Sequence, residues 1–142
     1  MRLTRYSDYA LRVLMYMGVR GDQLVTIDEI AGAYDISRNH VMKVVYHLGQ
    51  EGIIQTVRGR NGGMKLACEP AAINLGMLVR KTENDLALVE CFGPGNRCCL
   101  TPACVLKQAL GEALDAFLAV LDQYTLADLI APRQQLRGLL AV

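Results

Sequence analysis

The 142-residue sequence lacks any long apolar run, although 52% of its residues are hydrophobic. No segment approaches the roughly 18 consecutive apolar residues that a membrane-spanning helix needs. The N-terminal segment, MRLTRYSDYALR, also lacks the continuous apolar stretch of a signal peptide. We therefore expect no membrane association and a cytoplasmic protein, in which the thiols stay reduced.

The sequence also lacks the usual signs of an enzyme. It contains no nucleophile and base arrangement, no phosphate-binding glycine loop and no paired catalytic acids. Its two histidines, His40 and His47, lie in the same predicted helix and suit DNA contacts or a surface position. We therefore predict that the protein is not an enzyme.

A strong excess of one charge is missing as well, because the formal net charge is only +1. The charge is nevertheless uneven along the chain. Residues 1–67 carry nine Lys or Arg against six Asp or Glu, whereas residues 68–142 carry six against eight. A mildly basic first half and a mildly acidic second half agree with a nucleic-acid-binding domain that is joined to a second part of different function.

Three helices are predicted in the basic half. Apolar residues at i, i+3, i+4 and i+7 predict a first helix over residues 5–17. Thr26-Ile27-Asp28-Glu29 is a capping box for a second helix that ends near residue 34. Ser37 can cap a third helix, which Gly52 can end in a left-handed conformation. The inner face of this third helix carries Val41, Val44, Val45 and Leu48.

A β-hairpin is predicted directly after these helices. Residues 53–57 and 64–67 have strand character, and the loop between them is rich in glycine. Helix, helix, helix and hairpin are the elements of a winged helix. The predicted fold is therefore mainly α with a small β-hairpin, in which residues 1–67 form a winged helix-turn-helix DNA-binding domain.

The rest of the chain is predicted to hold two further parts. Residues 68–100 contain a connecting helix over 71–81 and a cysteine-rich loop, with residues 82–95 left open between strand and helical turn. Thr101 and Pro102 favour the start of a long helix to about residue 124. Its apolar residues recur at sevens, as in a seam that two helices share. We thus expect residues 101–142 to form a long dimerisation helix with an apolar tail that docks.

The outer face of the third helix carries the candidate DNA contacts. Arg and Asn side chains can contact base edges in the major groove, and Lys and Tyr can hold phosphates. Any helix has a solvated face, so the assignment depends on the helix-turn-helix and the hairpin that surround it. The candidates are Arg38, Asn39, His40, Lys43, Tyr46 and His47, with Arg58 and Arg60 on the wing. His40 is equally compatible with a half-buried cap.

Four of the five cysteines lie in the stretch CFGPGNRCCLTPAC. Cys91, Cys98 and Cys104 are spaced widely enough to surround one cluster or ion, and thiolates suit iron-sulfur clusters and zinc. Zinc sites commonly show closer cysteine pairs. Cys99 is adjacent to Cys98 and is the expected spare, although the two could exchange roles. Cys68, at the end of a strand, is expected to be a small buried hydrophobe.

Several motifs together resemble the family of iron-sulfur winged-helix repressors. They are LTRYSDYALRVLMYM, GRNGGMKLA and the three-cysteine loop before a long helix, and the resemblance covers essentially the whole chain. Within that family, PACVLKQAL followed by LDQYTLADL is most similar to the members that are sensitive to nitric oxide. The chain departs from the family in the six residues between Cys91 and Cys98, where others have four or five, and in the extra Cys99.

The resemblance implies a homodimer that binds a palindromic operator in double-stranded DNA and releases it when nitric oxide attacks the iron. It implies one cluster per subunit, 2Fe-2S or 4Fe-4S, with Cys91, Cys98 and Cys104 as ligands. It also implies that Asp8 of the partner subunit completes the coordination, whereas the alternative for Asp8 is a first-turn acid favoured by the helix dipole.

Two other functions remain open from the sequence. A regulator of iron or cluster supply would share the fold and sense cluster occupancy instead of nitric oxide. An electron carrier or metal-storage module would leave Arg58 and Arg60 without a role.

Overall fold

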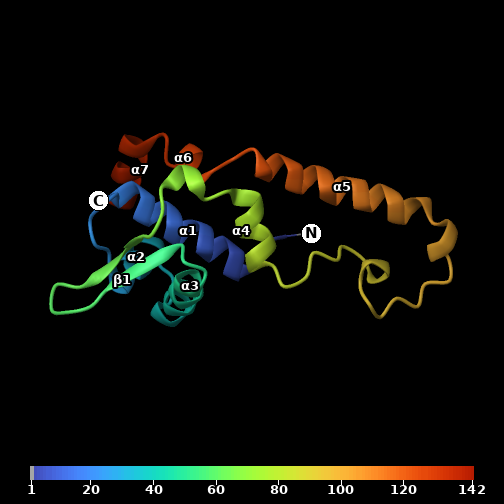
Figure 1. Ribbon diagram of the computed structural model, residues 1–142, viewed down its shortest axis with the longest axis horizontal. Coiled ribbons are helices and arrows are strands. Elements are labelled where there is room, and N and C mark those ends of the chain that lie inside the picture. Colours follow the sequence, from blue (N-terminus) through green and yellow to red (C-terminus); the bar gives the residue numbers. More distant parts are fainter. Residues whose placement is uncertain (1) are drawn as a thin grey trace.

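Helix α1 (Arg5–Arg20) is the central element of the helical head in the computed structural model, which describes residues 2–142. Helices α2 (Ile27–Tyr34) and α3 (Arg38–Gln50) follow it and pack against one another and, through α3, against α1. Figure 1 shows this head beside a long helix, α5, that extends away from it. The mainly helical fold with one small hairpin is confirmed.

The predicted starts of α2 and α3 are confirmed by their caps. Thr26 Oγ1 accepts from the Glu29 amide at 3.2 Å, and Glu29 Oε2 accepts from the Thr26 amide at 2.7 Å, which completes the capping box. Ser37 Oγ accepts from the His40 amide at 3.3 Å at the start of α3. Helix α1 runs three residues further than its apolar stripe predicts. Glu51 caps α3, and Gly52 follows it with the expected positive φ of 72°.

The core lies where these three helices meet. Ala10, Val13, Leu14 and Met17 of α1 are buried, as are Val41, Val44, Val45 and Leu48 of α3, and both sets belong to one cluster. These are the apolar stripes that the sequence predicts. Burial of each Val, Leu or Met side chain among them contributes about 1.5–3 kcal/mol to the free energy of unfolding.

The wing is an antiparallel hairpin of β1 (Ile54–Val57) and β2 (Gly63–Leu66), in which Ile54 pairs with Leu66 and Val57 with Gly63. A third short piece joins it, because Val25 exchanges backbone hydrogen bonds of 2.9 and 2.8 Å with Met64. Sequence patterns did not indicate this bridge, which ties the wing to the segment before α2.

The connecting helix is split, contrary to the prediction of one helix over 71–81. A 3-10 turn (Pro70–Ala72) comes first, and α4 (Leu75–Thr82) follows. The chain is extended at Ile73 and Asn74 because it bonds to a distant segment: the Leu126 amide donates to the Ile73 carbonyl at 2.9 Å. Asn74 then caps α4 by accepting from the Met77 amide at 3.0 Å.

The long helix α5 (Val105–Asp122) begins later than predicted. Thr101 and Pro102 form a separate 3-10 turn (Thr101–Ala103), and the Cys104 side chain, not that of Thr101, caps the α-helix. The segment before it is irregular apart from a 3-10 turn (Glu90–Phe92). Phe92 lies against α5, since a Cβ built on Gly111 would be 4.0 Å from its ring.

The C-terminal residues return to the head, as expected from their apolar character. Helices α6 (Leu126–Leu129) and α7 (Arg133–Leu140) pack on α1, and Leu140 and Val142 contact the core. Within residues 2–142, no helix combines the length and the apolar character that crossing a membrane requires.

Candidate nucleic-acid interface and cysteine loop

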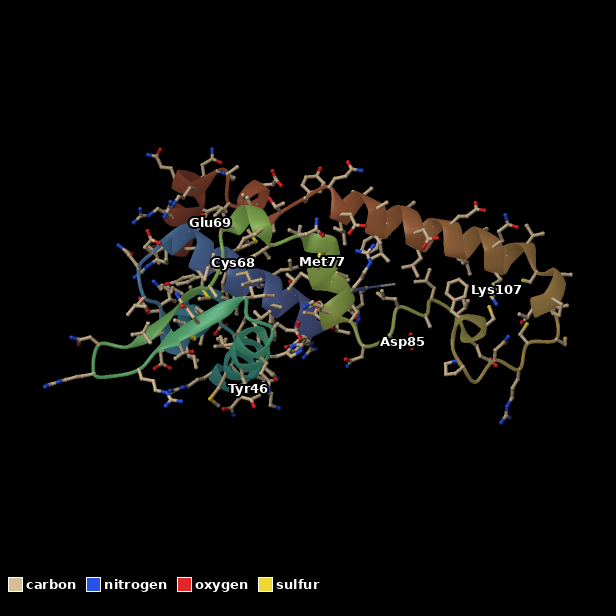
Figure 2. All side chains as sticks on the ribbon, viewed as in Figure 1. Tyr46, Cys68, Glu69, Met77, Asp85 and Lys107 are labelled. Carbon is tan, nitrogen blue, oxygen red and sulfur yellow. The ribbon has the colours of Figure 1, made fainter. Side chains whose placement is uncertain are left out.

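The outer face of α3 exposes most of the predicted DNA contacts. Arg38, Asn39 and Lys43 are exposed, and Tyr46 is 68% exposed. Figure 2 shows Tyr46 on the side of α3 that faces away from the head. Apolar residues bury one side of α3 against α1, so the polar side is left toward solvent. This face is free to enter a major groove.

The two histidines of α3 make contacts within the protein. His40 Nδ1 lies 3.0 Å from Ser37 Oγ, and its ring centroid is 5.7 Å from that of Tyr9. His47 Nδ1 shares a hydrogen bond of 2.5 Å with the Tyr6 hydroxyl, and His47 is half-buried. Their predicted role as DNA contacts therefore competes with these internal partners.

Arg58 and Arg60 are exposed on the loop between β1 and β2, which projects from the head in Figure 1. The loop needs glycine at two positions: Gly59 has a φ of 120°, and a Cβ at Gly62 would overlap the Val57 carbonyl oxygen. A groove of about 760 Å³ separates the wing from α3, with Arg38, Tyr46 and Thr56 among its lining residues. Helix α3 and the wing thus border one concave surface, which Arg38 lines and which Arg58 and Arg60 do not.

Arg38 is not locked in place. Its Nε lies 3.3 Å from Asp28 Oδ1, and both side chains are about two-thirds exposed, at 65% and 70%. An exposed pair of this kind contributes about 0–1 kcal/mol. Arg38 can therefore leave Asp28 for a phosphate or a base edge at little cost.

The cysteine loop lies at the far end of α5. Cys91 and Cys104 are half-buried, whereas Cys98 and Cys99 are exposed. The backbone of Cys98 is held on both sides: its amide donates to Asn96 Oδ1 at 2.9 Å, and its carbonyl accepts from Thr101 Oγ1 at 2.8 Å. Asn96 Nδ2 also donates to Thr101 Oγ1 at 2.9 Å. Asn96 and Thr101 thus form a hydrogen-bonded bracket around the Cys98 backbone, called the Asn96 bracket below.

Cys104 stands at the N-terminus of α5, where its Sγ accepts from the Lys107 amide at 3.4 Å. Amide donors at a helix N-terminus favour a negatively charged acceptor. Three thiols on one loop, one of them at a helix N-terminus, have the donor chemistry that an iron-sulfur cluster takes, although the structure does not bring the three together. Across residues 2–142, no three His, Cys, Asp or Glu side chains lie close enough together to share a single metal ion.

Cys68 was expected to be buried, and that prediction is wrong. It is exposed, because β2 ends at Leu66 and Cys68 lies in the following bend before the turn that begins at Pro70.

Asp8 lies in the first turn of α1 and is bound to Arg12. Arg12 Nη2 is 2.9 Å from Asp8 Oδ2, and Arg12 Nε donates to Asp8 Oδ1 at 3.1 Å. The Arg12 guanidinium also lies 5.9 Å from the centre of the Tyr34 ring. Burial raises the pKa of Tyr34 to about 12, so this phenol stays neutral. The Asp8 side chain is 46% exposed and can be reached from outside the subunit.

The candidate DNA-contacting face of α3 and the cysteine loop lie at different ends of the subunit. In Figure 2, Tyr46 on α3 and Lys107 on the first turn of α5 are widely separated. No side chain of the loop therefore reaches the face of α3 within one chain. Any influence of one on the other must pass through helices or through a second subunit.

Comparison with known proteins decides the family. Residues 3–132 match the family Rrf2, described as "Iron-dependent Transcriptional regulator". The chain belongs to the Rrf2 family. It is accordingly a DNA-binding transcriptional regulator and not an enzyme, as the sequence predicts.

Two curated Rrf2 relatives and one solved structure illustrate the match. HTH-type transcriptional regulator NsrR of Geobacillus kaustophilus is 56% identical, with 99% of this chain and 97% of the relative covered. NsrR of Bacillus subtilis is 51% identical with the same coverage. The structure of CymR, the global cysteine regulator of B. subtilis, matches with a TM-score of 0.75 and 23% identity over 92% of this chain and 97% of CymR. The chain is thus an NsrR-type member of the Rrf2 family.

Sequence patterns missed the residues that support the site. Asn96 and Thr101 hold the Cys98 backbone, and Tyr6 contacts His47. Asn in a glycine-rich loop is a known turn former, so the Asn96 bracket had a local signal. The Tyr6 contact had none, because it joins residues 41 positions apart.

Proposed function

We propose that this Rrf2 regulator is a repressor that senses nitric oxide through an iron-sulfur cluster, and that damage to the cluster releases it from operator DNA. The observation that carries the proposal is the presence, in one chain, of an exposed cationic face on α3 and the wing and of a three-thiol loop directly before α5. Its similarity to NsrR at 56% and 51% identity supports the repressor assignment.

The proposed ligands are Cys91, Cys98 and Cys104, with one cluster, 2Fe-2S or 4Fe-4S, in each subunit. When bound, the cluster supplies iron that nitric oxide can attack. Asp8 of the partner subunit is the proposed fourth ligand. Its exposure and its bond to Arg12 support this role, because Arg12 offers the carboxylate another partner when iron is absent.

The proposed assembly is a homodimer on a palindromic operator. Two identical reading heads match two half-sites that are about one helical turn apart. Arg38, Asn39, Lys43 and Tyr46 are the proposed groove contacts of each head, with His40 and His47 nearby. Arg58 and Arg60 are the proposed wing contacts to phosphate or to a narrow minor groove.

The test starts from anaerobically purified protein, with its visible absorption, iron and sulfide measured. Binding to an operator selected from randomised DNA duplexes is then compared before and after stoichiometric nitric oxide. We expect bleaching of the cluster and a 5- to 150-fold loss of affinity, roughly the usual range of allosteric coupling. A bleached protein that binds DNA as before would contradict the proposal.

The Arg58→Ala, Arg60→Ala double variant separates DNA binding from sensing. It should keep its cluster, bind all sequences more weakly, and lower the salt dependence of binding by about one unit for each lost phosphate contact. Arg137→Ala on α7 removes an exposed arginine elsewhere and is the matched control.

A second candidate is a regulator of iron or cluster supply with the same fold. The description of the Rrf2 family as iron-dependent regulators favours it. Equal loss of DNA binding on iron chelation and on exposure to nitric oxide would support this candidate over the first.

A further inference from the structure

The first turn of α1 is fastened to the end of α4. The Thr4 amide and hydroxyl donate to Glu83 Oε1 at 2.8 and 3.0 Å. The Ser7 hydroxyl donates to Thr82 Oγ1 at 2.8 Å, and both of these residues are buried. The turn that carries Asp8 is therefore a fixed point on this side.

On its other side the same turn reaches α3. The Tyr6 hydroxyl and His47 Nδ1 are 2.5 Å apart, and the two ring centroids are separated by 5.6 Å. The pair therefore joins the first turn of α1 directly to α3.

The far side of His47 faces a second link. His47 Nε2 lies 4.0 Å from Glu51 Oε1, and Glu51 forms an ion pair with Lys81 of α4. The hydrogen bond from Lys81 lowers the pKa of Glu51. His47 is thus held between Tyr6 of α1 and a carboxylate that α4 fixes.

Among the described residues, the other contacts between α1 and α3 carry no hydrogen bond between side chains. The Tyr9 and His40 rings lie 5.7 Å apart, and buried apolar side chains of the two helices, such as Val13 and Leu48, belong to one cluster. Apolar contacts tolerate small sliding movements, whereas a hydrogen bond weakens steeply with distance and angle. The Tyr6–His47 bond is therefore the feature of this contact that fixes the rotation and height of α3 relative to the start of α1.

We propose that Tyr6 and His47 form a positioning pair. Through this pair, the position of the first turn of α1 sets the position of the DNA-reading helix α3. This inference rests on the proposed function, in which Asp8, two residues after Tyr6, is bound or released. His47 directly follows Tyr46 on α3. Lys43 lines one cavity together with Tyr6 and His47. A shift of Tyr6 thus reaches two of the proposed DNA contacts.

Tyr6→Phe tests the pair because it removes only the hydroxyl. Tyr9→Phe, on the same helix and also half-buried, is the matched control. For each protein we would measure iron content and operator affinity with and without the cluster. Tyr6→Phe should keep its iron, and its ratio of the two affinities should fall about 3- to 10-fold, the size of one hydrogen bond. Tyr9→Phe should keep the ratio of the unchanged protein.

His47→Ala should reduce the same ratio, and the double variant should reduce it no further than either single change, as expected for two groups that act as one unit. Additive losses, or a normal ratio in Tyr6→Phe, would overturn the pair. A purely structural role would lower the melting temperature and leave the ratio unchanged.

A cluster-free measurement keeps this test separate from the proposed function. Hydrogen exchange of the amides from His47 to Glu51 should speed up about 3- to 10-fold in cluster-free Tyr6→Phe and not in Tyr9→Phe. If the unchanged protein binds DNA equally with and without its cluster, the sensing function fails, and this exchange result alone decides whether Tyr6 positions α3. Unchanged exchange would overturn the positioning pair.

Discussion

At the scale of single residues, the adjacent cysteines present a choice that the loop geometry addresses. Asn96 accepts from the amide of Cys98 and Thr101 donates to its carbonyl, so the backbone position from which the Cys98 side chain starts is fixed. Cys98 and Cys99 open a turn, in which the Thr101 amide donates to the Cys98 carbonyl at 3.3 Å, and adjacent residues of a turn do not easily bring both thiols to one small cluster. Fixing Cys98 toward the other two thiols would direct Cys99 away from them.

We therefore predict that Cys98→Ser loses the cluster and Cys99→Ser keeps it. The measurement is iron and sulfide content, with visible absorption, after anaerobic purification. Cys98→Ser should retain less than about one tenth of the iron, because a serine hydroxyl is a poor ligand for this soft site. The reverse outcome would make Cys99 the ligand. Asn96→Ala, which opens the bracket, should lower cluster retention in air without removing a thiol.

At the scale of helices and turns, the attachment of α5 to the head is the feature that sets its direction. Arg80 of α4 binds Asp122 of α5 through two bonds of 2.5 and 2.8 Å. Asn74 Nδ2 donates to the Asp122 carbonyl at 2.7 Å. Gly76 permits this approach, since a Cβ there would overlap Asp122 Oδ1. One end of α5 is thus held, and the other carries the cysteine loop.

This attachment should be sensitive to acid. The hydrogen bond from Arg80 lowers the pKa of Asp122 below its ordinary value of 3.8. A carboxyl group whose pKa is lower in the folded state contributes stability above the unfolded pKa and loses it as pH falls through the folded pKa. The contribution is therefore complete at neutral pH and begins to fall below about pH 4, as the pH approaches the lowered pKa of Asp122.

We predict that Asp122→Asn lowers the melting temperature at pH 7 and that the difference from the unchanged protein narrows as the pH falls below about 4 toward about 2. Circular dichroism melts between those values measure this directly. Glu112→Gln, which removes a charge elsewhere on α5, should show no such convergence. Gly76→Ala should separate α4 from α5 by steric overlap and cost about 1–3 kcal/mol, at every pH in this range.

The same scale shows what sequence patterns can predict. The caps at Thr26 and Ser37 and the apolar stripes of α1 and α3 are local signals, and they predicted the winged helix. The break at Ile73 and Asn74 was not predictable locally, because its cause is a hydrogen bond to Leu126. The start of α5 was placed too early because a thiol, Cys104, takes the capping position that Thr101 was expected to fill.

The candidate site follows the same division. Its cysteines lie on one loop and its cationic residues on one helix and one hairpin, so residue type and spacing were sufficient to nominate them. The residues that would connect them, such as Tyr6 and His47, are far apart in sequence and meet only through the packing of α1 on α3.

At the scale of the whole molecule, α5 leaves an apolar stripe without cover in the single chain. Val105, Leu106 and Val120 are 76%, 65% and 53% exposed. Helical spacing places the exposed Ala109, Ala113 and Ala116 between them. Figure 1 shows that α5 extends past the head, so a second chain can approach this side. Small residues in the middle of the stripe permit two helices to come close.

We predict that Leu106→Asp with Val120→Asp converts a dimer to monomers, because each buried contact would then hold an unpaired carboxylate. Sedimentation velocity at micromolar concentration measures the change. Binding to a palindromic operator should fall at least 100-fold, since one head alone contacts one half-site, while binding to a single half-site stays within about threefold. Ala119→Asp is the control, because Ala119 lies with Glu112 and Asp115 on the polar side of α5. A double variant that remains dimeric would place the subunit contact on another surface. The proposed approach of Asp8 to the partner's cysteine loop would then lose the α5 contact that supports it.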